Sequence, residues 1–333
     1  MQHGGDLALA IDRYGGTEKD WLDLSTGISP HAWPVPETLT TEVWQRLPGQ
    51  NALDRLLGAA RKAYGCPDTV GLVAAPGTQA LIALLPDLLG EGDVAIVSPT
   101  YPSHAAAWAR SGRKPLEVGY LEAIADTTRY AVVVNPNNPD GRLTSRASLQ
   151  AAAQVLAKRD GYLIIDEAFA DVVPGASLLP AIGDENILVL RSFGKFFGLA
   201  GLRLGFLAGP RRITRRFSER LDSWAVSGPA LEIGRRALAD TNWQEAMCRQ
   251  LADEMADLTL LLSEQGLSVF GGTPLFALAA TRNAAALHEA LARRRIWTRI
   301  FDYAPTWMRI GLPGSEENLQ RLRQALADAV KEL

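Results

Sequence analysis

Short apolar runs alternate with helical patterns from about Val70 to Leu207, and this alternation restricts the fold more than any other feature of the chain. The runs Val94–Val97, Tyr130–Val134 and Tyr162–Ile165 have the length and the side chains of buried strands. Strands that alternate with helices favour parallel βαβ units. We therefore predict an α/β protein with a mostly parallel central sheet.

The size, charge and cysteine content exclude several classes of protein. With 333 residues, the chain suits one catalytic unit of two packed domains. A formal net charge of −3 offers no broad basic surface to a nucleic acid. A local basic cluster consists of Arg211, Arg212, Arg215 and Arg216. Its spacing predicts a solvated helix face. Cys66 and Cys248 lie far apart in the sequence, so neither a disulfide framework nor a metal site is expected.

The apolar segments are short. Met1 is followed directly by polar residues, and no apolar run approaches the roughly 18 residues that span a bilayer. We therefore expect a cytoplasmic enzyme that acts on a small molecule and binds neither nucleic acid nor a membrane.

A lysine among small residues is the strongest indication of chemistry. Lys195 lies three residues after Ser192 and eight before Arg203. An amine can form a Schiff base with an aldehyde cofactor, and a hydroxyl and a guanidinium nearby can hold that cofactor's phosphate. The alternative is a surface lysine in a glycine-rich turn.

The complete run from Ser192 to Gly205 argues against that alternative, because it resembles the lysine segment of the class I and II aminotransferases. The resemblance implies fold type I, in which a lysine holds pyridoxal 5'-phosphate (PLP). It also implies that Lys195 is catalytic, that Ser192 and Arg203 bind the cofactor phosphate, and that the protein is a homodimer.

The strand Tyr162–Ile165 ends in a carboxylate, Asp166. By the same resemblance, Asp166 is the catalytic aspartate that pairs with the protonated pyridine nitrogen of PLP and keeps the ring able to accept electrons. A helix N-cap is the alternative for an aspartate at this place. Its position upstream of Lys195 favours the catalytic interpretation.

Two turns between strands and helices supply further cofactor contacts. The turn after Tyr130–Val134 contains Asn138, which by resemblance binds the phenolic oxygen of PLP and contacts the substrate. An ordinary Asn-Pro turn is the alternative. Gly77, Thr78 and Gln79 precede an apolar helical run and would present backbone N–H groups and a hydroxyl to the phosphate. Helix capping would explain them equally well.

An aromatic side chain follows the strand Val94–Val97. Tyr101 occupies the place where the family stacks a ring on the cofactor, and we count it with the catalytic residues. Simple packing is the alternative.

The chain departs from the family pattern twice. Phe169 stands where most members have a tyrosine, so Asn138 would hold the phenolic oxygen without a second hydroxyl. Leu47 replaces a tyrosine that in many members reaches the phosphate of the partner subunit.

Two segments near the N-terminus indicate the class of substrate. His3 and Gly4, followed by a loop that contains Gly27, are similar to the substrate-binding segments of the threonine-phosphate decarboxylases of cobalamin biosynthesis. A floppy terminus is the alternative for the first two residues.

Two arginines near the C-terminus lie in alternating, strand-like segments. Arg299 and Arg309 have apolar neighbours, and an arginine in such surroundings needs a partner. By resemblance, Arg309 binds the substrate carboxylate and Arg299 a second anionic group. Surface charge on an edge strand is the alternative, above all for Arg299.

We expect two domains. Residues 46–228 form a large PLP-binding domain, and residues 1–45 and 229–333 together form a smaller α+β domain. A connecting helix is predicted from Ala230 to Leu262, and a last helix from the N-cap Ser315 toward Leu333.

These features together predict a PLP-dependent decarboxylase that acts on L-threonine O-3-phosphate. An aminotransferase, such as one for histidinol phosphate, would use the same groups around the cofactor. A PLP-binding regulator is a third alternative, but the chain lacks length for an added DNA-binding domain and retains Lys195 and Asp166.

Overall fold

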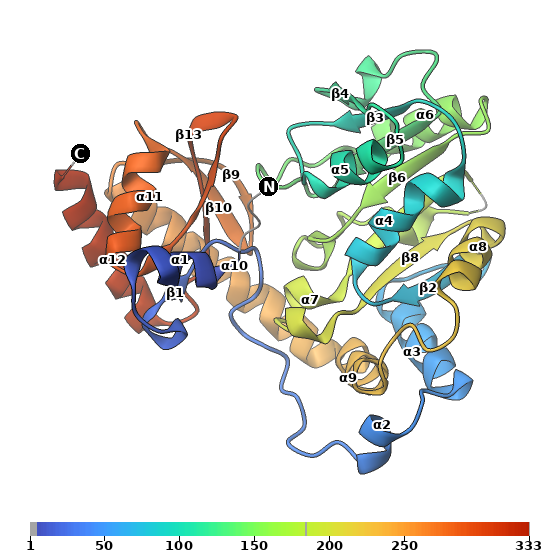
Figure 1. Cartoon of the computed structure of the whole chain (residues 1–333), viewed down its shortest axis with the longest axis horizontal. Helices are drawn as coiled ribbons and strands as arrows, with labels where there is room; N and C mark the ends of the chain where they lie inside the picture. The colour runs from blue at the N-terminus through green and yellow to red at the C-terminus, as the bar shows by residue number, and fades with distance from the viewer. Residues whose placement is uncertain (1–4, 184, 333) are drawn as a thin grey trace. The chain divides into compact units, whose positions relative to one another are not determined.

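The predicted sheet is present. Residues 5–183 and 185–332, which the computed structural model describes, contain a seven-stranded sheet in the order β2-β8-β7-β6-β5-β3-β4 (Figure 1). Its strands are β2 (Gly71–Ala75), β3 (Val94–Val97), β4 (Leu116–Val118), β5 (Tyr130–Val134), β6 (Tyr162–Asp166), β7 (Ile187–Ser192) and β8 (Gly205–Gly209). The four pairs from β4 to β7 are parallel, and β8 runs antiparallel to both of its neighbours. The prediction of a mostly parallel sheet is therefore confirmed.

Helices connect these strands and cover the sheet. They are α2 (Thr41–Gln45), α3 (Gln50–Ala63), α4 (Thr78–Leu89), α5 (Ser103–Arg110), α6 (Arg146–Ala157), α7 (Phe193–Phe196), α8 (Arg211–Leu221) and α9 (Gly228–Ala239). Short 3₁₀ turns are η2 (Leu121–Ala123), η3 (Ala170–Val172), η4 (Leu179–Ala181) and η5 (Ala200–Leu202). Serine side chains begin two of the helices, since Ser145 Oγ accepts from Ser148 N and Ser227 Oγ accepts from Ala230 N.

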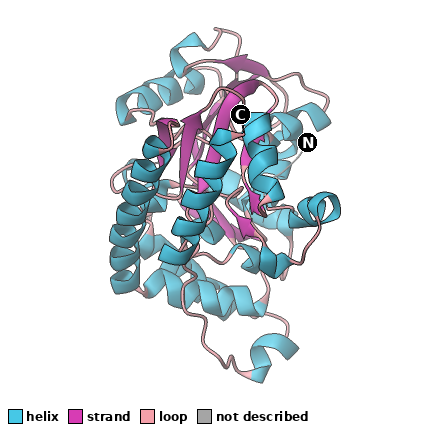
Figure 2. Cartoon of the chain, turned by 90° about the vertical axis from the view of Figure 1, so that its left-hand side faces the viewer, coloured by secondary structure: helices cyan, strands magenta, loops and turns pink. Residues whose placement is uncertain are grey.

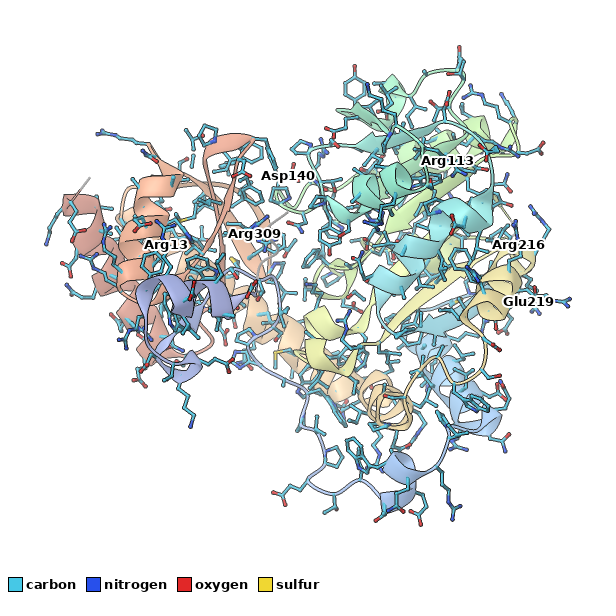
Figure 3. All side chains as sticks on the ribbon, viewed as in Figure 1. Arg13, Arg113, Asp140, Arg216, Glu219 and Arg309 are labelled. Atoms are coloured by element: carbon cyan, nitrogen blue, oxygen red, sulfur yellow. The ribbon has the colours of Figure 1, made fainter. Side chains whose placement is uncertain are left out.

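The core of this unit lies between the sheet and helices α4, α5 and α8. Trp108, Tyr130 and Phe217 are fully buried there, and the rings of Trp108 and Tyr130 stack at 5.4 Å. The opposite face of α8 is charged and exposed, as the arginine cluster predicts, and Arg216 and Glu219 project from it (Figure 3). Burial on one face and charge on the other hold α8 in its orientation.

The smaller unit combines both ends of the chain. Its elements are α1 (Leu7–Tyr14), η1 (Glu18–Asp20), β1 (Leu22–Asp23), most of α10 (Thr241–Glu264), β9 (Ser268–Thr273), β10 (Phe276–Ala280), α11 (Ala284–Arg293), β11 (Ile296–Trp297), β12 (Arg299–Phe301), β13 (Ala304–Gly311) and α12 (Glu316–Lys331). Among the described residues, its main sheet is antiparallel in the order β12-β13-β10-β9, and β1 pairs with β11 in parallel. Helices and strands thus form the predicted α+β unit (Figure 2).

The two compact units divide the chain near residues 31 and 245, whereas the sequence places domain boundaries after residues 45 and 228. Residues 32–45 pack with the larger unit because Trp33 N donates to Phe197 O (2.9 Å) and Trp33 Nε1 donates to Asp240 Oδ2 (3.1 Å). Helix α9 packs along α3 in the same unit. Residues 139–141 belong to the smaller unit, where Gly272 N donates to Asp140 O.

The single helix predicted from Ala230 to Leu262 is wrong. The segment forms two helices, α9 and α10, which are separated at Asp240. The carboxylate of Asp240 accepts from Trp243 N (3.1 Å) and so begins a new helix. The last helix is confirmed, because α12 starts after Ser315, whose Oγ accepts from Asn318 N. None of the helices in the described ranges combines the length and apolar character needed to cross a bilayer.

Candidate active site

The polar residues predicted from the sequence gather at one edge of the large sheet. The parallel strands β3, β5, β6 and β7 all end there, and β2 runs in the same direction. Because the carboxyl ends of parallel strands meet at one edge, the turns that follow them form a common site. The larger unit therefore places Thr78, Tyr101, Asn138, Asp166 and Lys195 in or after the turns at this edge.

Lys195 lies in α7, one turn beyond the end of β7. Its backbone is held by packing, since Phe193 and Phe197 are buried and their rings stack at 4.3 Å. Gly194 allows α7 to approach η5 closely, because a Cβ at this position would lie 2.7 Å from Ala200 Cα. Lys195 itself is half-buried, with its Nζ 5.9 Å from the centre of the Phe169 ring. The stacked rings thus hold the backbone at Lys195, and the amine of Lys195 lies in a partly apolar space.

Asp166 is the last residue of β6 and is buried. Its Oδ1 accepts from Ala168 N (3.1 Å), and its Oδ2 lies 2.9 Å from Nε2 of the fully buried His104. His104 belongs to α5 and packs edge to face against Tyr101, with 6.3 Å between the ring centres. The structure therefore fixes the Asp166 carboxylate between two strand ends.

His104 is the site residue that the sequence analysis missed. It lies three residues after Tyr101, in the first turn of α5, while Tyr101 precedes that helix. A histidine among small and apolar residues at that spacing was the available signal. Its partner, Asp166, lies on β6, which is distant in the sequence, so only the structure shows the contact.

The start of α4 forms a cradle with Arg203. Gly77 has a φ of +86°, and a Cβ built on it would lie 2.8 Å from Arg203 Nη2. A Cβ on Gly205 would lie 2.5 Å from Thr78 N. Both glycines therefore permit a close approach of backbone and guanidinium. The first N–H groups of a helix lack intrahelical acceptors, so an anion is favoured at this place.

Tyr101 connects the cradle to Asp166. Its hydroxyl donates to Gln79 Oε1 (3.2 Å), and its ring contacts His104. Gln79 is the second residue of α4. The predicted phosphate and pyridine ends of the site are thus joined by a continuous set of contacts.

The turn after β5 carries three asparagines with different surroundings. Asn137 is buried and bonds Pro99 O and the Thr100 hydroxyl, so it shapes the turn. Asn135 Oδ1 accepts from Thr144 N (2.8 Å). Asn138 is half-buried at the end of the turn.

The two departures from the family pattern also have clear positions. Phe169 is buried, and its ring faces Lys195. Leu47 is 68% exposed.

Arg299 and Arg309 lie opposite each other in the smaller unit. They are direct partners in the antiparallel pairing of β12 and β13 and therefore share one face of the sheet. Arg309 (Figure 3) is buried against Phe276, 5.1 Å from the ring centre, and its Nη2 donates to Ser25 O (2.5 Å). Burial, with a further effect of Arg299, lowers the pKa of Arg309 to about 10. Burial also lowers the pKa of Arg299. An anion at this face would relieve both effects.

The loop that contains Gly27 runs beside β13. Gly311 N donates to Leu24 O (2.8 Å), and a Cβ on Gly311 would lie 2.6 Å from Thr26 O. Ser25 Oγ accepts from Gly5 N, which ties the N-terminal segment to this loop. Gly27 is buried and lies two residues after Ser25, whose carbonyl oxygen accepts from Arg309. His3 and Gly4 lie outside the described residues.

A half-buried histidine near Arg299 makes stability depend on pH. His288 Nδ1 and Thr298 Oγ1 share a hydrogen bond of 2.8 Å. Burial lowers the pKa of His288 to about 4, with smaller effects of Arg13 and Arg299 in the same direction and of Glu289 against it. The unfolded chain therefore binds a proton below about pH 6.5 that the folded chain takes up only near pH 4. Stability is fully present above that window and falls as the pH decreases through it.

We expect His288→Asn, which keeps a polar atom near Thr298, to remove this dependence. As the pH falls through the window, the unfolding free energy of the wild type should decrease by up to about 3 kcal/mol more than that of the variant. Thermal unfolding of both proteins across the window measures it. Parallel curves at every pH would show that His288 does not titrate in this way.

Comparison with known proteins agrees with this geometry. The sequence pattern of the family "Aminotransferase class I and II" matches residues 40–326. The chain belongs to this family. The chain is 42% identical to the threonine-phosphate decarboxylase of Sinorhizobium sp, over 98% of this chain and 97% of that protein. It is 40% identical, over the same shares, to the threonine-phosphate decarboxylase of Pseudomonas aeruginosa.

The fold is also found among solved structures. The crystal structure of histidinol-phosphate aminotransferase from Sinorhizobium meliloti in complex with pyridoxal-5'-phosphate has a TM-score of 0.85, at 18% identity. The comparison covers 100% of this chain and 96% of that one. The family and the fold type expected from the lysine segment are therefore confirmed.

The residues present fit PLP, the cofactor of this family. An amine, a guanidinium, hydroxyls at a helix start and a buried carboxylate match its aldehyde, phosphate and pyridine nitrogen. The cradle at Gly77 agrees with this fit, since a side chain there would fill the space beside Arg203. Among the described residues, no group of three or more His, Cys, Asp or Glu side chains could hold a metal ion.

Proposed function

We propose that the protein is a threonine-phosphate decarboxylase. It would convert L-threonine O-3-phosphate to (R)-1-amino-2-propanol O-2-phosphate and carbon dioxide, a step of cobalamin biosynthesis. The observation that carries the proposal is the identity of 40–42%, over nearly the full length, to two proteins of that name. The arginine pair on β12 and β13 supports it, because two positive charges suit a substrate with two anionic groups.

The residues of the larger unit hold the cofactor. Lys195 would bind its aldehyde, and Asp166 would pair with its pyridine nitrogen. Gly77, Thr78, Gln79, Ser192 and Arg203 would hold its phosphate, while Tyr101 and Asn138 would bind the ring and the phenolic oxygen. Bound PLP supplies an electron-accepting ring that weakens a bond at the substrate Cα.

The protein's own groups choose and complete the reaction. Placed beside the pyridine nitrogen, the carboxylate of Asp166 would favour a protonated ring. The bond that breaks joins Cα to the carboxylate, which leaves as carbon dioxide, and the electron pair of that bond ends in a new bond between Cα and a proton. Lys195 would donate this proton.

The residues of the smaller unit bind the substrate. Arg309 is fixed by Ser25 O and by Phe276, and we assign it and Arg299 to the carboxylate and phosphate. His3, Gly4 and Gly27 complete the substrate site in this proposal, together with Asn138.

The proposal includes the surroundings of the enzyme. We expect a cytoplasmic homodimer that binds neither nucleic acid nor a membrane. Leu47 cannot donate a hydrogen bond to a phosphate as tyrosine does, so any contribution of the partner subunit at that position would be apolar.

The arginine pair provides a direct test. In Arg299→Ala and Arg309→Ala, we expect the KM for threonine phosphate to rise by roughly 30-fold or more, because a lost charged partner costs about 2–5 kcal/mol. PLP binding should change little. Unphosphorylated threonine should be a poor substrate of the wild type, and the variant that lacks the phosphate ligand should no longer distinguish the two. Carbon dioxide release and cofactor absorbance measure these effects.

Arg282→Ala is the matched control, since Arg282 is exposed in the same unit and should leave KM unchanged. Equal turnover of threonine and threonine phosphate would contradict the decarboxylase assignment. Accumulation of a keto product with a histidinol-phosphate-like donor, without carbon dioxide, would replace it with an aminotransferase.

A further inference from the structure

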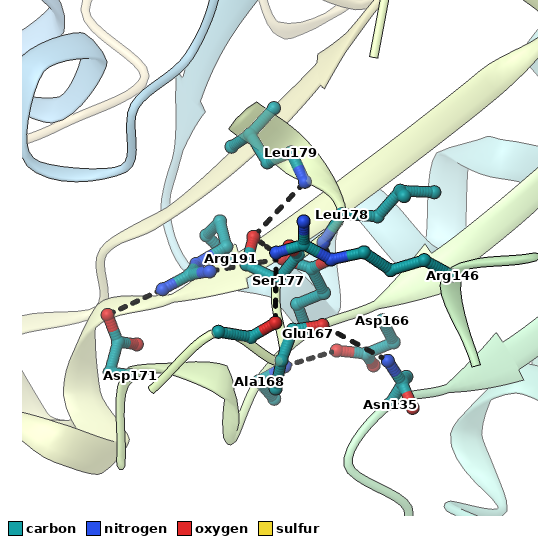
Figure 4. A network of polar contacts seen from close by, with 12 residues as sticks. Asn135, Arg146, Asp166, Glu167, Ala168, Asp171, Ser177, Leu178, Leu179 and Arg191 are labelled. Carbon is teal, nitrogen blue, oxygen red and sulfur yellow. Dashed lines mark hydrogen bonds and ion pairs between the residues drawn. The ribbon is translucent and has the colours of Figure 1, made fainter. Parts of the chain in front are cut away.

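A buried ionic network lies beside Asp166 (Figure 4). Arg191 Nη1 donates to Glu167 Oε2 (3.0 Å), and its Nη2 donates to Asp171 Oδ1 (2.6 Å). Glu167 also accepts from the Ser177 hydroxyl (2.5 Å) and from Leu178 N (2.7 Å). Arg191 and Glu167 are almost completely buried. The mechanism above uses none of these side chains.

Residues of the network are adjacent in sequence to predicted cofactor residues on two strands. Glu167 follows Asp166 at the end of β6, and Arg191 precedes Ser192 at the end of β7. Successive side chains of a strand point to opposite faces, so Asp166 meets His104 while Glu167 meets Arg191 on the other side. Glu167 N also donates to Leu190 O (2.9 Å). The ion pair thus joins the two strands whose ends carry the cofactor residues.

Arg191 also orders the segment after β6. Its contacts with Glu167 and Asp171 enclose Phe169, whose ring faces Lys195. The later part of the segment is held at Ser177, both by Glu167 and by Arg146, which donates to Ser177 O (3.2 Å) (Figure 4). A change at Arg191 would therefore move Asp166 and Phe169 together.

Burial makes the network an expensive way to stabilise a fold. Burial raises the pKa of Glu167 and of Asp171, while Arg191 acts against this at both carboxyls. Apolar residues of similar volume often stabilise a core as well as a buried ion pair does or better. What the ion pair adds is direction, because a guanidinium fixes two carboxylates at defined angles.

We infer that Arg191 and Glu167 are positioning residues for the cofactor site: they hold the ends of β6 and β7 so that Asp166, Phe169 and Lys195 keep their relative places. This inference rests on the binding of PLP at Lys195 and not on the identity of the substrate.

The test compares Arg191→Lys and Glu167→Gln with the wild type. Lysine keeps the charge but cannot reach both carboxylates in a fixed fork. We expect kcat to fall by about 10- to 100-fold, with a nearly unchanged KM for threonine phosphate, because small displacements of reacting groups have effects of this size. The pH at which the visible absorbance of Lys195-bound PLP changes should shift by about one unit.

The absorbance titration needs no substrate, so it tests the inference even if the substrate assignment fails. The matched control is Arg215→Lys with Glu219→Gln, an exposed pair on α8 at 2.8 Å, for which we expect neither change. If the Arg191 variant does not fold, Ser177→Ala removes a single hydrogen bond to Glu167 and should produce a smaller shift of the same kind. Lower melting temperatures with wild-type kcat and titration would overturn the inference and leave the network a purely structural one.

Discussion

In Lys195→Ala, we expect turnover of threonine phosphate to fall by roughly 10⁴-fold, because the variant loses both the attachment of the cofactor and the proton donor to Cα. The protein should remain folded, since the backbone around residue 195 is held by the stacked Phe193 and Phe197 rather than by the lysine. Borohydride reduction followed by mass measurement should show a cofactor adduct in the wild type and none in the variant.

Lys158→Ala serves as the control. Lys158 is exposed at the end of α6, and its loss should affect neither the adduct nor turnover. A trappable adduct that persists in Lys195→Ala would mean that another lysine carries the cofactor, and the proposed site would then be misplaced.

Local sequence patterns predicted the elements of the larger unit well. The runs Tyr130–Val134 and Val94–Val97 are strands with the predicted bounds, and Asp166 lies at the end of its strand as expected. A buried strand in a parallel sheet is continuously apolar, and few other structures produce this sequence pattern. The positions of Tyr101, Asn138 and Asp166 follow from it, because each lies at or just after the end of such a strand.

Contacts between distant segments could not be predicted in the same way. The carboxylate of Asp240 divides the predicted helix in two because it also accepts from Trp33, which lies more than two hundred residues earlier. The partners of His104 and Arg191 likewise come from other strands. Periodicity shows which face of an element is buried, but it does not show which polar group of a neighbouring element contacts that face.

The second large effect is expected at Asp166. In Asp166→Asn, the neutral amide can no longer favour a protonated pyridine nitrogen, and we expect kcat to fall by roughly 10²- to 10³-fold. This range corresponds to about 3–4 kcal/mol of lost transition-state stabilisation. The amide oxygen can still accept from Ala168 N, so folding should persist. Steady-state kinetics and the absorbance of bound PLP separate the two effects.

Asp126→Asn is a matched control, because Asp126 forms an exposed ion pair with Arg159 at the same distance of 2.9 Å that separates Asp166 from His104. An exposed pair contributes little, so this variant should behave as the wild type does. Asp166→Glu, which keeps the charge, should recover part of the lost turnover if the longer side chain still reaches the ring. Near-normal rates in Asp166→Asn would instead assign Asp166 to the fold, as the residue that fixes His104 and the start of the segment after β6.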